Sequence, residues 1–275
     1  MARKAATTEG EAPTRALDRG LQILEVVARR TSATLAEIAA ETDLSPATAS
    51  RILRTLERRG FVSRDTETKQ FRVGLAAFEV GSRFLAETRL QETCRLILRK
   101  LTVATEQSTT LAVLHRADIV YLDAHEGTAL LRSTPQIGSR APAHATASGK
   151  CLLSARWGEG LVQAIGPGPY AAVTERTITT ADRLTQELLT VRKTGIAFDR
   201  EELHPNISCM ACPVHDRAGE VVASVAIQAP TPLMTDHADD WTLLLRSAAA
   251  ESSLRLGWRD RYQDVRADRT ASLTD

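Results

Sequence analysis

Two helix-start signals stand close together in this chain, and their spacing constrains the fold more than any other feature. Thr34 and Glu37 can form a capping box, in which the hydroxyl and the carboxylate each accept a hydrogen bond from a free amide of the first turn. Ser45 and Pro46 form the second signal, because serine is a favourable N-cap and proline is tolerated at the first helical position. The chain between the signals has room only for a short helix and a tight turn. Gly60 then predicts the end of the second helix.

The second of these helices has one apolar face and one polar face. Its core-facing residues are predicted to be Ala49, Ile52, Leu53 and Leu56. The opposite face begins with short side chains, which let a helix enter the major groove of DNA, and continues as a row of arginines that can reach bases or phosphates. The residues predicted to contact DNA from this helix are Ser45, Ala47, Thr48, Ser50, Arg51, Arg54 and Arg58. A merely solvated charged face is the alternative, but the tight turn before the helix favours DNA binding.

Two short strands are predicted after this helix, at 61–64 and 70–73, around a polar turn. Such a hairpin would be the wing of a winged helix-turn-helix. Arg64, Lys69 and Arg72 are predicted to lie along DNA phosphates, which position a protein without reading sequence. Residues 44–73 hold seven Lys or Arg and three Asp or Glu, so their net charge is 7 − 3 = +4, whereas the whole chain carries +1. The positive charge is therefore concentrated in this segment.

Helices are also predicted on both sides of this module. Upstream, Leu17, Leu21, Leu24 and Ala28 recur at helical spacing and predict a first helix whose stripe completes a three-helix core. Downstream, residues 75–89 have helical character, with Leu75, Phe78 and Leu85 on one side. This apolar stripe exceeds what a bare spacer needs. We interpret the segment as a linker helix that packs against a partner subunit, with packing inside its own chain as the alternative.

Beyond Leu90 the pattern changes to a mixture of helices and strands. Helices are predicted at about 91–106, 181–193 and 236–256, the last carrying Trp241, Leu244, Leu245 and Ala248. Strands are predicted at about 109–115, 119–123, 208–214 and 221–228. The order of these elements indicates an α+β domain.

The composition fits an intracellular chain of two domains. With 275 residues and 43% hydrophobic content, the chain can bury one smaller and one larger core. No apolar run is long enough to span a bilayer and the first residues show no signal region, so a cytoplasmic location is expected. The four cysteines, Cys94, Cys151, Cys209 and Cys212, show no disulfide framework. Residues 1–14 and 258–275 lack apolar periodicity and are predicted to be mobile tails.

Four stretches of the sequence together resemble the IclR family of bacterial transcription regulators. They are LSPATASRIL at 44–53, GSRAPAHATASGK at 138–150, GIAFDREE at 195–202 and CMACPV at 209–214. The resemblance implies a winged helix-turn-helix at 15–74, a linker helix at 75–89 and a GAF-like α+β effector domain at 90–257. It also implies a ligand-responsive regulator of a metabolic operon that binds a pseudo-palindromic double-stranded DNA operator as a homodimer or homotetramer. No enzymatic activity, metal or cofactor is expected, and the sign of regulation does not follow.

The same resemblance implies the residues of an effector site. By motif position these are Ala147, Ser148, Asp199, Cys209, Ala226 and Gln228. A helix that opens at 146–149 would offer free amides to a carboxylate, and Gln228 lies on the same strand face as Ala226. Family members that bind small keto acids tend to have serines at these last two positions. The change predicts that a larger or aromatic organic acid is the effector.

The cysteines leave two other interpretations open. Cys209 and Cys212, with His204 and His215, resemble the spacing of a zinc site or of a redox-responsive pair, although residues three apart in a strand point to opposite faces. Cys209 could also be a nucleophile with His144 or His204 as its base. The nucleophile interpretation leaves the helix-turn-helix unexplained, whereas the metal or redox interpretation would make the chain a metal- or redox-responsive regulator.

Overall fold

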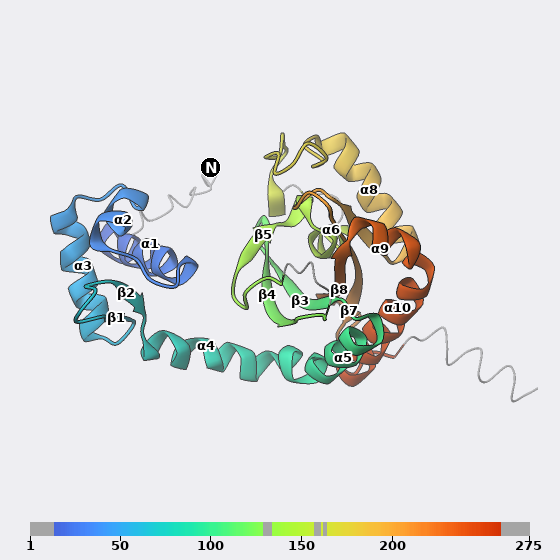
Figure 1. Ribbon diagram of the computed structural model, residues 1–275, viewed down its shortest axis with the longest axis horizontal. Coiled ribbons are helices and arrows are strands. Elements are labelled where there is room, and N and C mark those ends of the chain that lie inside the picture. Colours follow the sequence, from blue (N-terminus) through green and yellow to red (C-terminus); the bar gives the residue numbers. More distant parts are fainter. Residues whose placement is uncertain (1–13, 129–133, 157–160, 162–163, 260–275) are drawn as a thin grey trace, which may run out of the picture. The chain divides into compact units, whose positions relative to one another are not determined.

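The computed structural model describes residues 14–128, 134–156, 161 and 164–259. The chain divides into two compact units, Met1–Thr88 and Arg89–Asp275 (Figure 1). The predicted tails lie almost entirely outside the described residues, so their mobility stays a prediction. No helix in the described ranges is long and apolar enough to cross a membrane.

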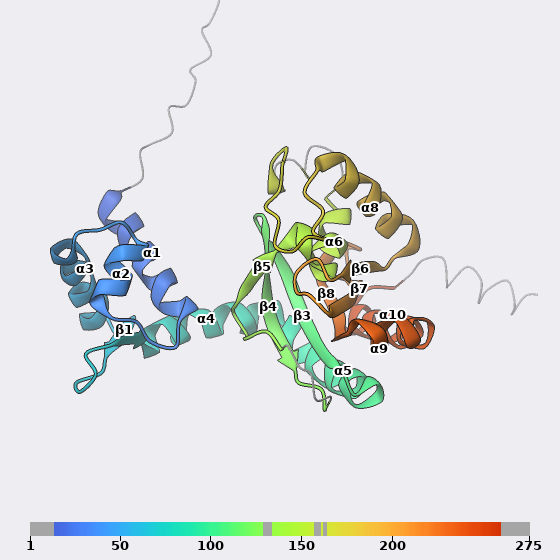
Figure 2. The same cartoon turned by 45° about the horizontal axis from the view of Figure 1, so that its top comes forward.

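The first unit is a helix-turn-helix followed by a two-stranded hairpin and a longer helix (Figure 2). Its elements are α1 (Arg15–Arg29), α2 (Leu35–Glu41), α3 (Pro46–Arg58), β1 (Val62–Arg64), β2 (Phe71–Val73) and α4 (Leu75–Thr88). The predicted capping box is confirmed: the Thr34 amide donates to Glu37 Oε2 at 2.7 Å, and the Glu37 amide donates to Thr34 Oγ1 at 3.3 Å. The Ser45 hydroxyl caps α3, and Gly60 follows the helix with a φ of +75°. The predicted winged helix-turn-helix is confirmed.

The apolar stripe predicted for α1 is wrong in part. Leu17 and Leu21 are 63% and 53% exposed and Ala28 is exposed, whereas Leu24 is partly buried against the core. The residues that the helix buries against α2, α3 and the hairpin are Ile23, Val26 and Val27. Apolar residues occur on two sides of α1, and helical periodicity alone cannot say which side meets the core. In α4, Leu75 and Phe78 are also exposed, at 70% and 68%, and the side chain of Leu85 lies outside the described part.

The second unit contains a six-stranded antiparallel sheet in the order β5-β4-β3-β8-β7-β6. The strands are β3 (Ser108–His115), β4 (Asp118–His125), β5 (Arg140–Pro142), β6 (Ala197–Arg200), β7 (Ile207–His215) and β8 (Val221–Pro230). The helices are α5 (Leu90–Thr105), the 3-10 turn η1 (Ala143–Ala145), α6 (Ala147–Ser154), α8 (Ala181–Thr194), α9 (Thr231–Asp236) and α10 (Ala238–Arg255). The predicted α+β domain is confirmed.

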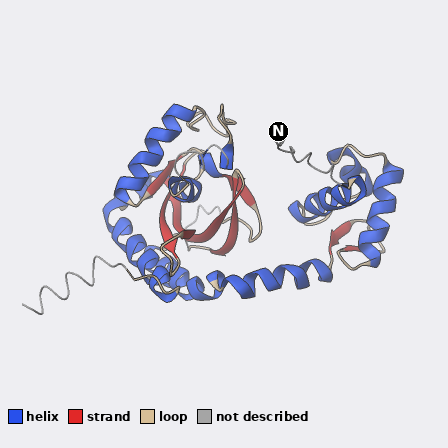
Figure 3. Cartoon of the chain, turned by 180° about the vertical axis from the view of Figure 1, so that it is seen from behind, coloured by secondary structure: helices blue, strands red, loops and turns tan. Residues whose placement is uncertain are grey.

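The two faces of the curved sheet are covered differently. Helix α6 lies inside the curve, where it contacts β3, β6, β7 and β8 (Figure 3). Helices α5 and α10 cover the other face, and the Thr109 hydroxyl of β3 donates to the Leu98 carbonyl of α5 at 3.2 Å. The helix predicted at about 236–256 is observed as α10, within two residues at each end. The short α9 before it, which ends next to His237, was not predicted, and Leu244 of α10 is 38% exposed.

Close packing inside the curve depends on residues with little or no side chain. Ala147 and Cys151 of α6 contact Ala197, Ala211 and Ala226, which lie side by side on β6, β7 and β8. At the start of the helix, a Cβ atom on Gly149 would overlap the backbone of Ala143. Small side chains therefore set how deeply α6 sits in the sheet.

We predict that Gly149→Ala destabilises the second unit by at least about 2 kcal/mol, because the added methyl meets backbone atoms that cannot move independently. Urea unfolding measures the loss. The matched control is Gly81→Ala in α4, a helical glycine with no atom within 4 Å of an added Cβ. That control gains up to about 1 kcal/mol from helix propensity. Equal stability of Gly149→Ala and the wild type would contradict the packing described here.

Candidate nucleic-acid interface and ligand site

The polar face of α3 is open to solvent along its length. Ala47, Arg51, Arg54 and Arg58 are exposed, and the opposite face buries Ala49 and Leu53 in the core. None of the three arginines forms an ion pair with an acid in the described ranges. Their guanidinium groups are therefore available to phosphates or base edges.

The residues at the start of α3 have structural roles as well. The Ser45 hydroxyl accepts a hydrogen bond from the Thr48 amide at 3.3 Å and lies 2.9 Å from the Thr48 hydroxyl. Ser50 and Thr48 are only partly exposed. Ser45 therefore satisfies one free amide of the helix terminus, and it is exposed at the start of the polar face.

The hairpin presents its basic residues on a rigid turn. Asp65 Oδ1 accepts hydrogen bonds from the amides of Glu67 and Thr68, at 2.9 and 2.8 Å, and these bonds hold the pKa of Asp65 below its usual range. The polar turn predicted between the two strands is therefore observed, and an aspartate followed by short polar residues is its usual signal. The guanidinium of Arg64 lies 5.3 Å from the centre of the Phe71 ring, so packing orients it.

In the second unit, four side chains form a row across the face that α6 covers. Asp199 pairs with Cys209, Cys209 with Gln228 and Gln228 with Ser108, on four neighbouring strands. Directly paired residues project from the same face of a sheet. Ala226, two residues from Gln228, contacts α6, so the whole row projects to that side. Asp199 is 1% exposed, while Cys209 and Gln228 remain partly exposed.

The N-terminus of α6 offers fewer amides than expected. The Thr146 hydroxyl accepts a hydrogen bond from the Gly149 amide at 3.0 Å, as an N-cap does. Our expectation that the amides from Ala147 to Gly149 all face a ligand is therefore corrected. The amides of Ala147 and Ser148 have no partner within the helix, because a helix leaves its first amides unpaired.

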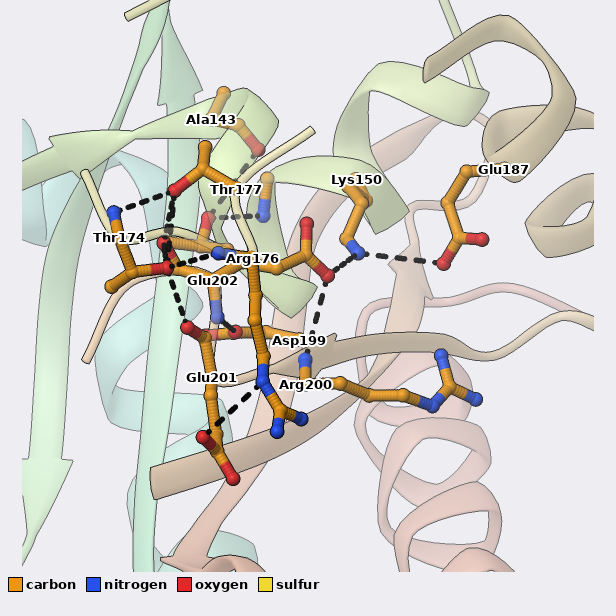
Figure 4. A network of polar contacts seen from close by, with 12 residues as sticks. Ala143, Lys150, Thr174, Arg176, Thr177, Glu187, Asp199, Arg200, Glu201 and Glu202 are labelled. Atoms are coloured by element: carbon orange, nitrogen blue, oxygen red, sulfur yellow. Dashed lines mark hydrogen bonds and ion pairs between the residues drawn. The ribbon is translucent and has the colours of Figure 1, made fainter. Parts of the chain in front are cut away.

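A buried lysine anchors a network of acids beside this row (Figure 4). Lys150 of α6 is fully buried, and its Nζ donates to Glu202 Oε1 at 2.6 Å and to Glu187 Oε1 at 3.4 Å. The Glu202 amide in turn donates to Asp199 Oδ1 at 2.6 Å. Burial raises the pKa of Asp199 to about 7, and the nearby Glu202 carboxylate adds to this effect.

Two residues near this row were missed by the sequence analysis. Lys150 ends the 138–150 stretch that carries the family resemblance, but no local pattern shows that a lysine in a helix will be buried. Tyr121 of β4 is 7% exposed, and Asp199 and Cys209 are close enough that, together with burial, they raise its pKa. A tyrosine in a predicted strand carries no signal of a site, so only the strand order brings it here.

The geometry argues against the metal and thiol interpretations. Cys209 and Cys212 project from opposite faces of β7, and the described residues contain no group of three or more His, Cys, Asp or Glu that could hold a metal ion. Burial and the neighbouring Asp199 raise the pKa of the Cys209 thiol well above its usual value, which keeps the thiol protonated. His144 Nε2 lies 2.9 Å from the Ala171 carbonyl oxygen, so this ring nitrogen is already engaged.

Comparison with known proteins places both units in one family. The IclR helix-turn-helix domain matches residues 16–66, and the C-terminal domain of bacterial IclR transcriptional regulators matches residues 82–254. The transcriptional regulator BhcR of Paracoccus denitrificans is 35% identical over 81% of this chain and 80% of its own length.

Two solved structures share the fold. The IclR protein of Thermotoga maritima is 26% identical with a TM-score of 0.68, covering 89% of this chain and 99% of its own. An IclR homologue from Microbacterium hydrocarbonoxydans, solved with 4-hydroxybenzoate, is 22% identical with a TM-score of 0.77, covering 88% of this chain and 98% of its own. With both family domains matched in order, the chain belongs to the IclR family of DNA-binding transcriptional regulators and is not an enzyme.

Proposed function

We propose that this regulator binds a pseudo-palindromic operator as a homodimer or homotetramer and releases or engages it in response to a small organic acid. The row formed by Asp199, Cys209 and Gln228 beside the amides of Ala147 and Ser148 is the observation that carries the effector part. Helix amides favour an anion, and Gln228 can donate and accept hydrogen bonds. We propose that the regulated genes form a metabolic operon. The promoters next to the regulator's own gene are the first to test for binding.

The proposed DNA contacts are the ten residues on α3 and the hairpin: Ser45, Ala47, Thr48, Ser50, Arg51, Arg54, Arg58, Arg64, Lys69 and Arg72. They divide into two kinds by position. We propose that residues in the first turns of α3 read bases, whereas the hairpin residues contact phosphates.

We predict that Arg51→Ala loses discrimination between operator and mutated operator by about 1–3 kcal/mol at particular base pairs. Lys69→Ala is expected to weaken binding to all duplexes alike and to reduce the slope of log K against log salt by about 1. Fluorescence anisotropy over a salt series measures both effects. Arg99→Ala on α5 removes the same charge elsewhere and serves as the control. Uniform weakening by Arg51→Ala would show that Arg51 contacts only phosphate.

Assembly is proposed to use the apolar side chains that the first unit leaves uncovered. Leu17 and Leu21 on α1 and Leu75 and Phe78 on α4 are each more than half exposed. Such exposure of large apolar residues on two helices is typical of a protein interface. A two-fold dimer would hold two α3 helices at the fixed separation that a pseudo-palindrome requires.

We predict that Phe78→Glu reduces dimer formation and operator affinity together, because the variant places a charge in an apolar seam. Sedimentation velocity measures the assembly state. Glu79→Gln, at an exposed neighbouring position of α4, changes charge outside the seam and is expected to leave assembly intact. An unchanged sedimentation coefficient for Phe78→Glu would place the interface elsewhere.

The effector is proposed to be a monocarboxylate larger than the smallest keto acids, with aromatic acids as the first candidates. Ala226 offers no hydroxyl to a small ligand, and Gln228 offers an amide instead. The 4-hydroxybenzoate bound by the Microbacterium homologue supports the choice of probe. An effector changes operator occupancy only by as much as it prefers one arrangement of the protein over another.

We predict that a carboxylate from such a panel raises the melting temperature of the full chain, and that Gln228→Ala removes this shift while operator binding without ligand persists. A thermal-shift screen followed by anisotropy measures both. Gln136→Ala removes an exposed amide in the same unit and serves as the control. Stabilisation only by a metal ion, or only after thiol oxidation, would overturn the carboxylate proposal.

A further inference from the structure

The acids beside the proposed effector row outnumber the cations. Lys150 is the only lysine or arginine buried among the described residues, and two carboxylates already share it, those of Glu202 and Glu187. Asp199 adds a third acid within the same network. Glu202 Oε2 is buried without a hydrogen-bond partner, so the network has no donor to spare. An ionised Asp199 would therefore be a buried charge without a cation of its own.

Apart from Lys150, the groups that face Asp199 from the surrounding elements supply no positive charge. Cys209 on β7 and Tyr121 on β4 are neutral at ordinary pH, since burial raises both pKa values. Gln228 on β8 does not titrate. From α6 only Lys150 carries a positive charge, and its Nζ already donates to Glu202. On the strand itself, the Arg200 guanidinium turns away and lies 4.6 Å from the centre of the Phe198 ring.

A second anion cannot enter such a site without a proton. The low polarity of the interior makes two neighbouring carboxylates costly, and protein sites of this kind hold one shared proton between them. A protonated Asp199 also becomes a hydrogen-bond donor, whereas an ionised carboxylate only accepts. Its Oδ1 is already engaged by the Glu202 amide. The Leu203 amide and the Cys209 thiol also hydrogen-bond to this carboxyl group.

We propose that the effector is a monocarboxylate that binds as the anion together with one proton, which Asp199 takes from solvent and donates in a hydrogen bond to the bound carboxylate. The inference rests on the proposed effector function. The complex gains one negative and one positive charge, so the charge of the buried network does not change. A dicarboxylate would need a second proton and is therefore excluded near neutral pH. Lys150 acts as a positioning residue, because it holds Glu202, whose amide orients Asp199.

The first test measures Asp199 without any ligand. A folded-state pKa of about 7, against an ordinary value of 3.8, means that Asp199 stabilises the fold fully below pH 3.8 and that this contribution is lost as pH rises to 7. The isosteric Asp199→Asn variant lacks the effect. The wild type is expected to lose urea resistance relative to this variant between pH 4 and 7. The control is Asp123→Asn, which alters a buried acid paired with Arg95 on the other face of the sheet. A constant difference between Asp199→Asn and the wild type would overturn the inference.

The second test measures binding of 4-hydroxybenzoate, benzoate and terephthalate to the full chain by calorimetry from pH 6 to 8.5. The wild type is expected to take up one proton per bound monocarboxylate at pH 8, seen as a dependence on the buffer's ionisation heat. Its Kd should rise tenfold per pH unit above about pH 7. Asp199→Asn is expected to bind without this dependence, while Asp123→Asn keeps it. Terephthalate is expected to bind at least tenfold more weakly than benzoate at pH 7.5.

The outcomes separate the inference from the function on which it rests. If these acids and a wider carboxylate panel fail to bind at every pH, the proposed effector function fails. If a monocarboxylate binds with a pH-independent Kd and no proton uptake, the function stands and the inference is overturned. Equal affinity for benzoate and terephthalate at pH 7.5 would also overturn it.

Discussion

The contact between α6 and the inner face of the curved sheet is the interaction on which the second unit depends. It is made by residues with almost no side chain, Ala147 against Ala197, Ala211 and Ala226, and Gly149 lets the same helix approach the backbone of Ala143 in η1. Such close approach carries the helix start to the row of Asp199, Cys209 and Gln228. The same approach buries Lys150 completely, since the lysine extends from this helix. The close packing of α6 therefore sets both its position beside the proposed ligand groups and the burial of Lys150.

A buried ion network is seldom favourable for stability alone. Removing a lysine and two carboxylates from water costs more than their mutual attraction commonly returns, unless hydrogen bonds satisfy the remaining atoms. Here Lys150 is paired twice, yet Glu202 Oε2 has no partner. Buried charged groups with an unsatisfied oxygen atom are characteristic of binding sites, where the protonation state of a side chain matters for function. Asp123 is also a buried acid, but the Arg95 guanidinium lies 3.4 Å from its Oδ2.

In the first unit, hydrogen bonds between residues close in sequence determine where the elements begin and end. The capping box at Thr34, the Ser45 cap and the turn at Asp65 each satisfy backbone amides close to them in sequence. A small core of Ile23, Val26, Ile38 and Leu53 then holds the helices together. Apolar side chains remain in excess, on α1 and α4, because so small a unit cannot bury them all. This surplus supports the proposal that the unit functions in pairs.

The sequence by itself determined the family and most of the elements. Caps, glycines and apolar spacing act over a few residues, so α2, α3, the hairpin and four strands of the sheet were predicted within one or two residues, whereas the short β5 and β6 and the helix α9 were not predicted. The resemblance of its motifs to the family also identified Asp199, Cys209 and Gln228 as candidate effector-site residues. The tertiary structure decided which side of α1 faces the core, since both sides carry apolar residues. It decided that Lys150 is buried and that Tyr121 stands near Asp199, because burial and cross-strand neighbours depend on residues far apart in the chain. It also decided that Thr146 occupies the Gly149 amide, since cap geometry depends on where the helix begins.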